Sequence, residues 1–142
     1  MKKTLAVLVL VPFLMGCASC VSWMTSRGQS WEEMQAVGGL RVDDPATQPD
    51  GRIFLPVLCN VSGLETITVK PTMMNSALVV RKIDGRVRGG KIQIQVVTGL
   101  IDHRHTTRPK GVALGRLKKG VYPVEYRNPD GRTVAVRNVE IK

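Results

Sequence analysis

Aromatic residues are scarce in this sequence, and histidine and cysteine are scarcer still. The 142 residues include six aromatic residues, two histidines and three cysteines. With so few aromatic rings, a hydrophobic core has to be built from Val, Ile and Leu. A nucleic-acid surface that interleaves basic and aromatic side chains is also disfavoured. Two histidines and three cysteines leave little material for a zinc centre, which usually takes three or four protein ligands.

The N-terminal apolar run is too short to cross a bilayer. It covers residues 5–15, which is 11 residues, whereas a membrane-spanning helix needs about 20. The run follows Lys2 and Lys3. A short apolar segment behind a positive N-terminus is typical of a secretory signal peptide, so residues 1–16 are predicted to be a removable leader.

The end of this leader, Leu14-Met15-Gly16-Cys17, resembles the lipobox of bacterial prolipoproteins, although Met15 is less usual there than Ala or Ser. The resemblance covers roughly the first 20 residues and implies that Cys17 becomes the acylated N-terminus of the mature protein. Each buried acyl methylene adds about 0.8 kcal/mol of membrane affinity, so two or three chains form a stable anchor. Ala18, where Asp would retain a lipoprotein in the inner membrane, implies the outer membrane, with the domain facing the periplasm. The alternative is an ordinary secretory signal.

A short helix and a loop are predicted to precede the main domain. Ser30 and Glu33 fit a capping box, in which each side chain accepts a hydrogen bond from the backbone amide of the other residue. Apolar residues spaced three apart share one face, and a glycine pair then ends the helix. These signals predict a helix over 31–37 within a lipid-anchored tether of residues 17–51, followed by a β domain over 52–142.

From residue 52 onward the sequence has a β pattern. Asp84-Gly85 predicts a two-residue hairpin, because both central positions of a type I′ turn need positive φ, and Gly89-Gly90 predicts a further turn or bulge. Many short strands without a long helix predict an all-β fold: a small antiparallel β-sandwich of the immunoglobulin or transthyretin kind, or a barrel. About seven strands are predicted, over 53–59, 64–70, 77–83, 91–98, 112–117, 121–127 and 132–141.

Charge is unevenly distributed along the chain. The sequence has 21 Lys and Arg against 11 Asp and Glu, a formal net charge of +10. Residues 17–80 hold four basic and six acidic side chains, whereas residues 81–142 hold fifteen and five. So basic a surface attracts anions such as lipid head groups, lipopolysaccharide phosphates and acidic protein patches. The alternative is that the charge serves solubility alone.

The basic residues of the C-terminal half gather around predicted turns. If those turns meet at one end of the domain, the side chains form an anion-binding or partner-binding rim; if they are spread around it, they form a solvated surface. Basic residues on edge strands also prevent edge-to-edge association, which is a structural role. The candidate binding residues are Arg81, Lys82, Arg86, Arg88, Lys91, Arg104, Arg108, Lys110, Arg116, Lys118 and Lys119.

Cys20 and Cys59 belong to a chain that is predicted to be exported, and disulfides persist in that compartment. A bridge between them would close a loop of about 40 residues and contribute roughly 3–4 kcal/mol by restricting the unfolded chain. The alternative is that Cys59 is a buried free thiol on a strand. Both interpretations stay open.

Few residues suit catalysis or metal binding. His103 and His105 stand beside Asp102, but no fourth ligand lies near them in the sequence, so no metal or other cofactor is predicted. A serine or cysteine nucleophile needs a base and a residue that orients the base, and no such motif occurs. The protein is therefore predicted not to be an enzyme. No nucleic-acid-binding motif occurs either, and no nucleic-acid partner is expected.

These features predict a non-enzymatic accessory or docking factor for a larger envelope complex, such as secretion, surface-fibre or outer-membrane machinery. Its partners would be the lipid bilayer, through acylated Cys17, and an envelope protein. One alternative is binding of an anionic polymer, lipopolysaccharide or peptidoglycan, through the basic rim. Another is inhibition of a host hydrolase such as lysozyme, which long-range repulsion between two basic proteins disfavours.

Overall fold

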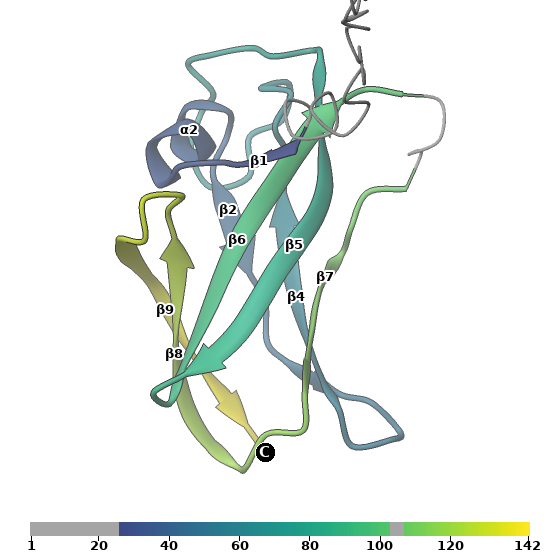
Figure 1. Ribbon diagram of the computed structural model, residues 1–142, viewed down its shortest axis with the longest axis vertical. Helices are drawn as coiled ribbons and strands as arrows, with labels where there is room; N and C mark the ends of the chain where they lie inside the picture. The colour runs from purple at the N-terminus through teal and green to yellow at the C-terminus, as the bar shows by residue number, and fades with distance from the viewer. Residues whose placement is uncertain (1–25, 103–106) are drawn as a thin grey trace, which may run out of the picture.

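The computed structural model describes residues 26–102 and 107–142. The described residues form nine strands and one short helix, arranged as two sheets that enclose one core (Figure 1). The all-β fold is confirmed: within this part of the chain the sheets form a small sandwich and do not close into a barrel. The elements are β1 Ser26–Gly28, α2 Trp31–Ala36, β2 Leu40–Val42, β3 Ala46–Thr47, β4 Ile53–Cys59, β5 Leu78–Arg88, β6 Lys91–Leu100, β7 Gly111–Gly115, β8 Gly120–Arg127 and β9 Thr133–Ile141.

The front sheet of Figure 1 is built around β6. β5 pairs with β6 along its whole length, β1 and β8 also pair with β6, and β9 pairs with β8. The sheet is not wholly antiparallel as predicted, because β6 and β8 run parallel, with Ile92 opposite Val124. Between these two strands the chain crosses to the back sheet as β7, and it therefore returns to the front sheet in the direction of β6.

The back sheet is built around β4, which pairs with β2, β3 and β7. Side chains alternate between buried and half-buried along β4 and along most of β6, as period-two apolar patterns predict. The inward side chains of both sheets meet Met34 of α2 in one core made mostly of Val, Ile and Leu. Tyr126 of β8 is the largest fully buried side chain in that core.

The hairpin between β5 and β6 turns at Gly89-Gly90, so the turn predicted at Asp84-Gly85 is wrong. Gly89 and Gly90 have φ of 58° and 72°, as a type I′ turn requires. Asp84 and Gly85 lie inside β5 and pair with β6. A Cβ on Gly85 would lie 2.7 Å from Cγ2 of Val112 on β7. This glycine therefore allows close packing between the sheets and makes no turn.

The strand predicted over 64–70 is also wrong. Residues 60–77 form a long loop between β4 and β5, here called the cap loop, which is fastened to the end of α2. The carbonyl of Gly38 accepts hydrogen bonds from the amides of residues 67–69, at 2.9, 3.0 and 3.2 Å, and the carbonyl of Ala36 accepts two more from the cap loop. Carbonyls at a helix C-terminus lack intrahelical partners. The loop amides bind these carbonyls instead of a neighbouring strand.

The segment 26–47, expected within the tether, contributes strands to both sheets. Its capping box is confirmed: the Glu33 amide donates to Ser30 Oγ at 3.2 Å, and the Ser30 amide donates to the Glu33 carboxylate at 2.8 Å.

No helix in the described part of the chain is both long and apolar enough to span a bilayer. The predicted lipobox, with Cys17, lies outside the described residues.

Candidate binding surface

Four of the predicted binding residues already have an acidic partner. A neighbouring carboxylate offsets the charge of each, which weakens its attraction for an external anion. Hydrogen bonds from Lys91 and Arg108 hold the pKa values of Glu125 and Glu65 below the ordinary range. The four pairs are Arg81–Asp102 at 3.1 Å, Lys82–Asp84 at 3.3 Å, Lys91–Glu125 at 2.9 Å and Arg108–Glu65 at 3.2 Å.

Six other predicted binding residues have no carboxylate within salt-bridge distance among the described residues. Arg116 instead donates from Nε and Nη2 to the backbone carbonyl of Asp50, at 3.2 and 2.9 Å. Arg104 lies outside the described residues, as do His103 and His105. Positive charge without a paired carboxylate is therefore found on β5, just before β7, and between β7 and β8. The six are Arg86, Arg88, Lys110, Arg116, Lys118 and Lys119.

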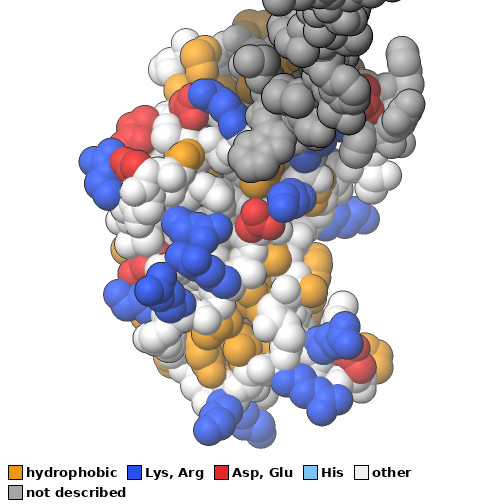
Figure 2. Space-filling model, viewed as in Figure 1, with side chains coloured by type: hydrophobic (Ala, Val, Ile, Leu, Met, Phe, Trp, Pro, Cys, Tyr) orange, Lys and Arg blue, Asp and Glu red, His pale blue; other side chains and the backbone are white. Residues whose placement is uncertain are grey.

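Three arginines, here called the arginine cluster, share the outer face of the front sheet: Arg86 and Arg88 of β5 and Arg127 of β8. Arg86 Nε donates to Gln93 Oε1 at 2.9 Å, and Arg127 Nη2 donates to Gln95 Oε1 at 3.4 Å. Gln93 and Gln95 are two apart on β6 and therefore lie on one face. Figure 2 shows basic side chains gathered over this sheet.

Arg86 interacts electrostatically with the two other arginines of the cluster. Partial desolvation lowers the pKa of Arg86, and the positive charges of Arg127 and Arg88 lower it further. Glu125 lies on the same face, but Lys91 binds its carboxylate. Guanidinium groups match the geometry of carboxylates and phosphates, and an anion bound here would relieve their mutual repulsion. The cluster is therefore suited to an anionic group.

Arg127 was missed by the sequence analysis. It ends a predicted strand directly before the turn at 128–131, and it was not among the basic residues assigned to the rim. The strand position alone could not place it beside Gln95, because the parallel pairing of β6 and β8 follows from the chain crossing between sheets. Only the pairing of β6 with β8 identifies Arg127 as a neighbour of Gln95.

The structure divides the predicted rim between the two ends of the sandwich. The β5–β6 hairpin and the connection between β7 and β8, with Lys118 and Lys119, lie at the lower end of Figure 1. Arg81 lies at the other end, where it donates a hydrogen bond to the carbonyl of Leu100. Arg108 lines a cavity with Ile101 at that same end. The predicted residues thus do not form one continuous rim.

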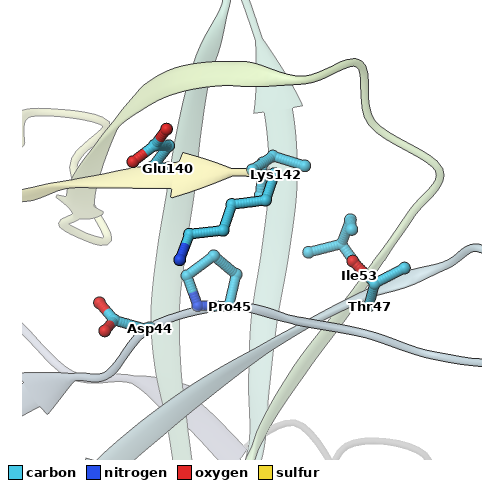
Figure 3. Close-up of a pocket in the computed structure, with 7 residues that line it drawn as sticks. Asp44, Pro45, Thr47, Ile53, Glu140 and Lys142 are labelled. Atoms are coloured by element: carbon cyan, nitrogen blue, oxygen red, sulfur yellow. The ribbon is translucent and has the colours of Figure 1, made fainter.

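A separate cavity of about 330 Å³ lies between β3 and the end of β9. Its carboxylates, Asp44 and Glu140, come from different segments, and Arg137 already binds Asp44 at 2.8 Å. In residues 26–102 and 107–142, no three His, Cys, Asp or Glu side chains gather in a way that could hold a metal. The cavity therefore provides no argument for catalysis. Figure 3 shows its lining residues Asp44, Pro45, Thr47, Ile53, Glu140 and Lys142.

The chain matches no protein-family model, no curated protein and no solved structure. Its function is therefore argued from the geometry of the described surface and from the predicted anchor.

Cys59 ends β4 and is buried, with 1% of its surface exposed. It forms no disulfide with any described residue. Burial raises the pKa of its thiol from 9.0 to about 12, and the charge of Arg108 opposes this only in part. The proposed partner, Cys20, lies outside the described residues, so the bridge stays a prediction.

We expect Cys59 to resist iodoacetamide in the folded protein and to react once the protein is unfolded, because the reactive species is the thiolate. The folded thiol keeps its proton at pH values where the unfolded thiol loses it. The free energy of unfolding should therefore fall as the pH rises from about 9 toward 12. Mass spectrometry of alkylated peptides measures the reactivity. If unfolded Cys59 reacts only after reduction, it is held in a disulfide, and a peptide that links it to Cys20 would identify the predicted bridge.

Proposed function

We propose that the protein is a lipid-anchored, non-enzymatic accessory factor of the bacterial envelope. It docks through the arginine cluster onto an acidic surface of a partner protein in a larger envelope complex. The lipobox resemblance supports acylation at Cys17 and an outer-membrane location. The observation that carries the docking proposal is the arrangement of Arg86, Arg88 and Arg127 on one sheet face, with no carboxylate in salt-bridge distance among the described residues.

The rigid setting of the cluster favours a folded partner. All three arginines stand on strands, and glutamine side chains of the neighbouring strand hold two of their guanidinium groups. A pre-organised side chain loses less entropy on binding, and arginine is enriched among the residues that dominate protein interfaces. A flexible anionic polymer would be served equally well by mobile lysines. The two guanidinium groups held by Gln93 and Gln95 instead suit carboxylates that are themselves fixed.

We expect the double variant Arg86→Glu/Arg88→Glu to lose its partner. The experiment crosslinks the full lipidated protein in cells, purifies it and identifies the captured protein by mass spectrometry. Loss of a desolvated interfacial charge pair costs about 2–5 kcal/mol, so stoichiometric capture should fall by more than about tenfold. The variant should stay folded, because the substitutions remove like-charge repulsion from an exposed face. Circular dichroism checks this.

The matched control is Arg52→Glu/Lys142→Glu, which changes the net charge equally but lies away from the cluster. It should keep the partner. Equal loss in both variants would mean that net charge governs binding, and full retention in both would refute docking through the cluster. Capture of lipopolysaccharide or peptidoglycan fragments without a protein would replace the protein partner with an anionic polymer. In the same cells, a palmitate analogue should label the wild-type protein and leave Cys17→Ala unlabelled. An unlabelled wild type would refute the anchor.

A further inference from the structure

An exposed apolar surface occupies one end of the sandwich. It comprises residues from the cap loop and from the end of β6, and is here called the apolar end. Contiguous exposed apolar surface in a soluble domain marks contact with another protein or with a membrane. Its members, with their exposed fractions, are Leu64 at 68%, Met73 at 43%, Met74 at 70%, Leu100 at 50% and Ile101 at 59%.

These side chains are neighbours although they are far apart in the sequence. Leu64 and Ile101 line the same cavity of about 330 Å³. The Ile101 amide donates to the carbonyl of Ala77 at 2.9 Å, which joins the end of β6 to the end of the cap loop. Within that loop, a Cβ on Gly63 would lie 1.9 Å from the carbonyl oxygen of Met73. The backbone of Met73 and Met74 therefore packs against Gly63, the residue directly before Leu64.

The chain enters the described domain at this same end. Ser26, the first residue of β1, pairs with Gly99, which directly precedes Leu100 on β6. The Gln29 amide donates to the carbonyl of Val96 at 2.9 Å, so β1 is held in place on the front sheet. Ser26 is the ninth residue after Cys17, and nine extended residues reach at most about 30 Å. A lipid on Cys17 would hold the apolar end within that distance of the bilayer.

Charge and composition at the apolar end suit a lipid surface better than an aqueous one. The stretch 71–76 (PTMMNS) carries no charged side chain. Arg108 lines the same cavity as Ile101, beside the apolar residues, and Glu65 at 3.2 Å already neutralises its charge. Because a tether raises the local concentration of the second contact, a modest apolar area is enough to seat the domain on the membrane.

We infer that the apolar end is a membrane-seating surface, with Met73, Met74, Leu100 and Ile101 at the boundary between head groups and acyl chains. This inference rests on the proposed lipid anchor. The sandwich then stands on the bilayer, and the β5–β6 hairpin and the connection between β7 and β8 point away from it (Figure 1). In this orientation the arginine cluster faces sideways from the front sheet and remains open to a partner protein.

The test places a photoreactive p-benzoylphenylalanine at position 74, 101 or 121 of the full lipidated protein in cells. Val121 is the matched control, because it is also apolar and 65% exposed but is the second residue of β8, at the opposite end. After irradiation, mass spectrometry of peptides around each position measures added phospholipid mass. We expect phospholipid adducts at positions 74 and 101 and none at position 121.

The same digest reports the acyl group on the peptide that begins at Cys17, which separates the two proposals. An acylated Cys17 with no phospholipid adduct at 74 or 101 overturns the membrane-seating surface and leaves the anchor intact. Adducts at 74 and 101 that carry a protein instead of a lipid identify a protein interface and also overturn it. Phospholipid adducts at all three positions would mean that the domain lies against the membrane in no fixed orientation, which overturns it as well. A Cys17 without acyl groups overturns both proposals.

Discussion

Tyr126→Ala is expected to lower the free energy of unfolding by about 3–5 kcal/mol, a large share of the stability of a small domain. Tyr126 is fully buried, and its ring centroid lies 5.4 Å from that of Trp31 on α2. Its hydroxyl donates to the carbonyl of Gln29 at 2.8 Å and accepts from the amide of Val96 at 3.3 Å. The substitution removes ring packing and two buried hydrogen bonds together. Urea denaturation measures the loss.

Tyr126→Phe separates these two contributions. It keeps the ring but leaves the carbonyl of Gln29 and the amide of Val96 without the hydroxyl, which should cost about 1–3 kcal/mol. Hydrogen exchange should accelerate at residues 26–29 more than on β4, because the hydroxyl fastens the strand that leads toward the predicted anchor. If Tyr126→Phe matches the wild type in both measurements, the hydroxyl does not hold β1. If it matches Tyr126→Ala, ring packing contributes little.

Local patterns were enough to predict much of the fold. The alternation of apolar residues marks β4 and β6 because each strand buries one face against the core. The helix begins where Ser30 and Glu33 cap each other, an interaction confined to four consecutive residues. These local predictions were confirmed because the contacts that decide them lie within the strand or the helix turn itself.

The wrong predictions of secondary structure arise where tertiary contacts determine the local conformation. Asp84-Gly85 has the composition of a turn, but Gly85 is needed where β7 packs against β5. Residues 64–70 alternate like a strand, but their amides bind the end of α2. Such contacts join segments separated by many residues, and no local pattern encodes them.

The candidate binding surface shows the same division. The sequence identified Lys82, Arg86 and Arg88 as candidates alike. Only the structure separates Lys82, which pairs with Asp84, from Arg86, which meets Gln93 and other arginines. It also adds Arg127, through a strand pairing that the sequence could not reveal. Lys82 is neutralised within its own strand, whereas the neutralisation of Lys91 by Glu125 depends on the pairing of β6 with β8.

Gly38→Ala is expected to lower the free energy of unfolding by about 3–5 kcal/mol, from backbone strain and a steric clash together. Gly38 has a φ of 123°, and a Cβ there would lie 2.2 Å from the carbonyl oxygen of Glu65. Relief of the clash requires movement of the cap loop, which three hydrogen bonds to Gly38 hold in place. Urea denaturation measures the loss, and hydrogen exchange at residues 67–69 should accelerate.

Gly89→Ala is the control, because Gly89 also has a positive φ, of 58°, but a Cβ there would meet no atom within 4 Å. It should cost only about 1–2 kcal/mol, the strain of the left-handed conformation. Equal losses in the two variants would mean that the cap loop does not press on Gly38. If the loop does press there, Gly38→Ala should displace Met73 and Met74 while it leaves β6 in place. Phospholipid adducts at position 74 should then decrease and those at position 101 should persist, since only the cap loop depends on this contact.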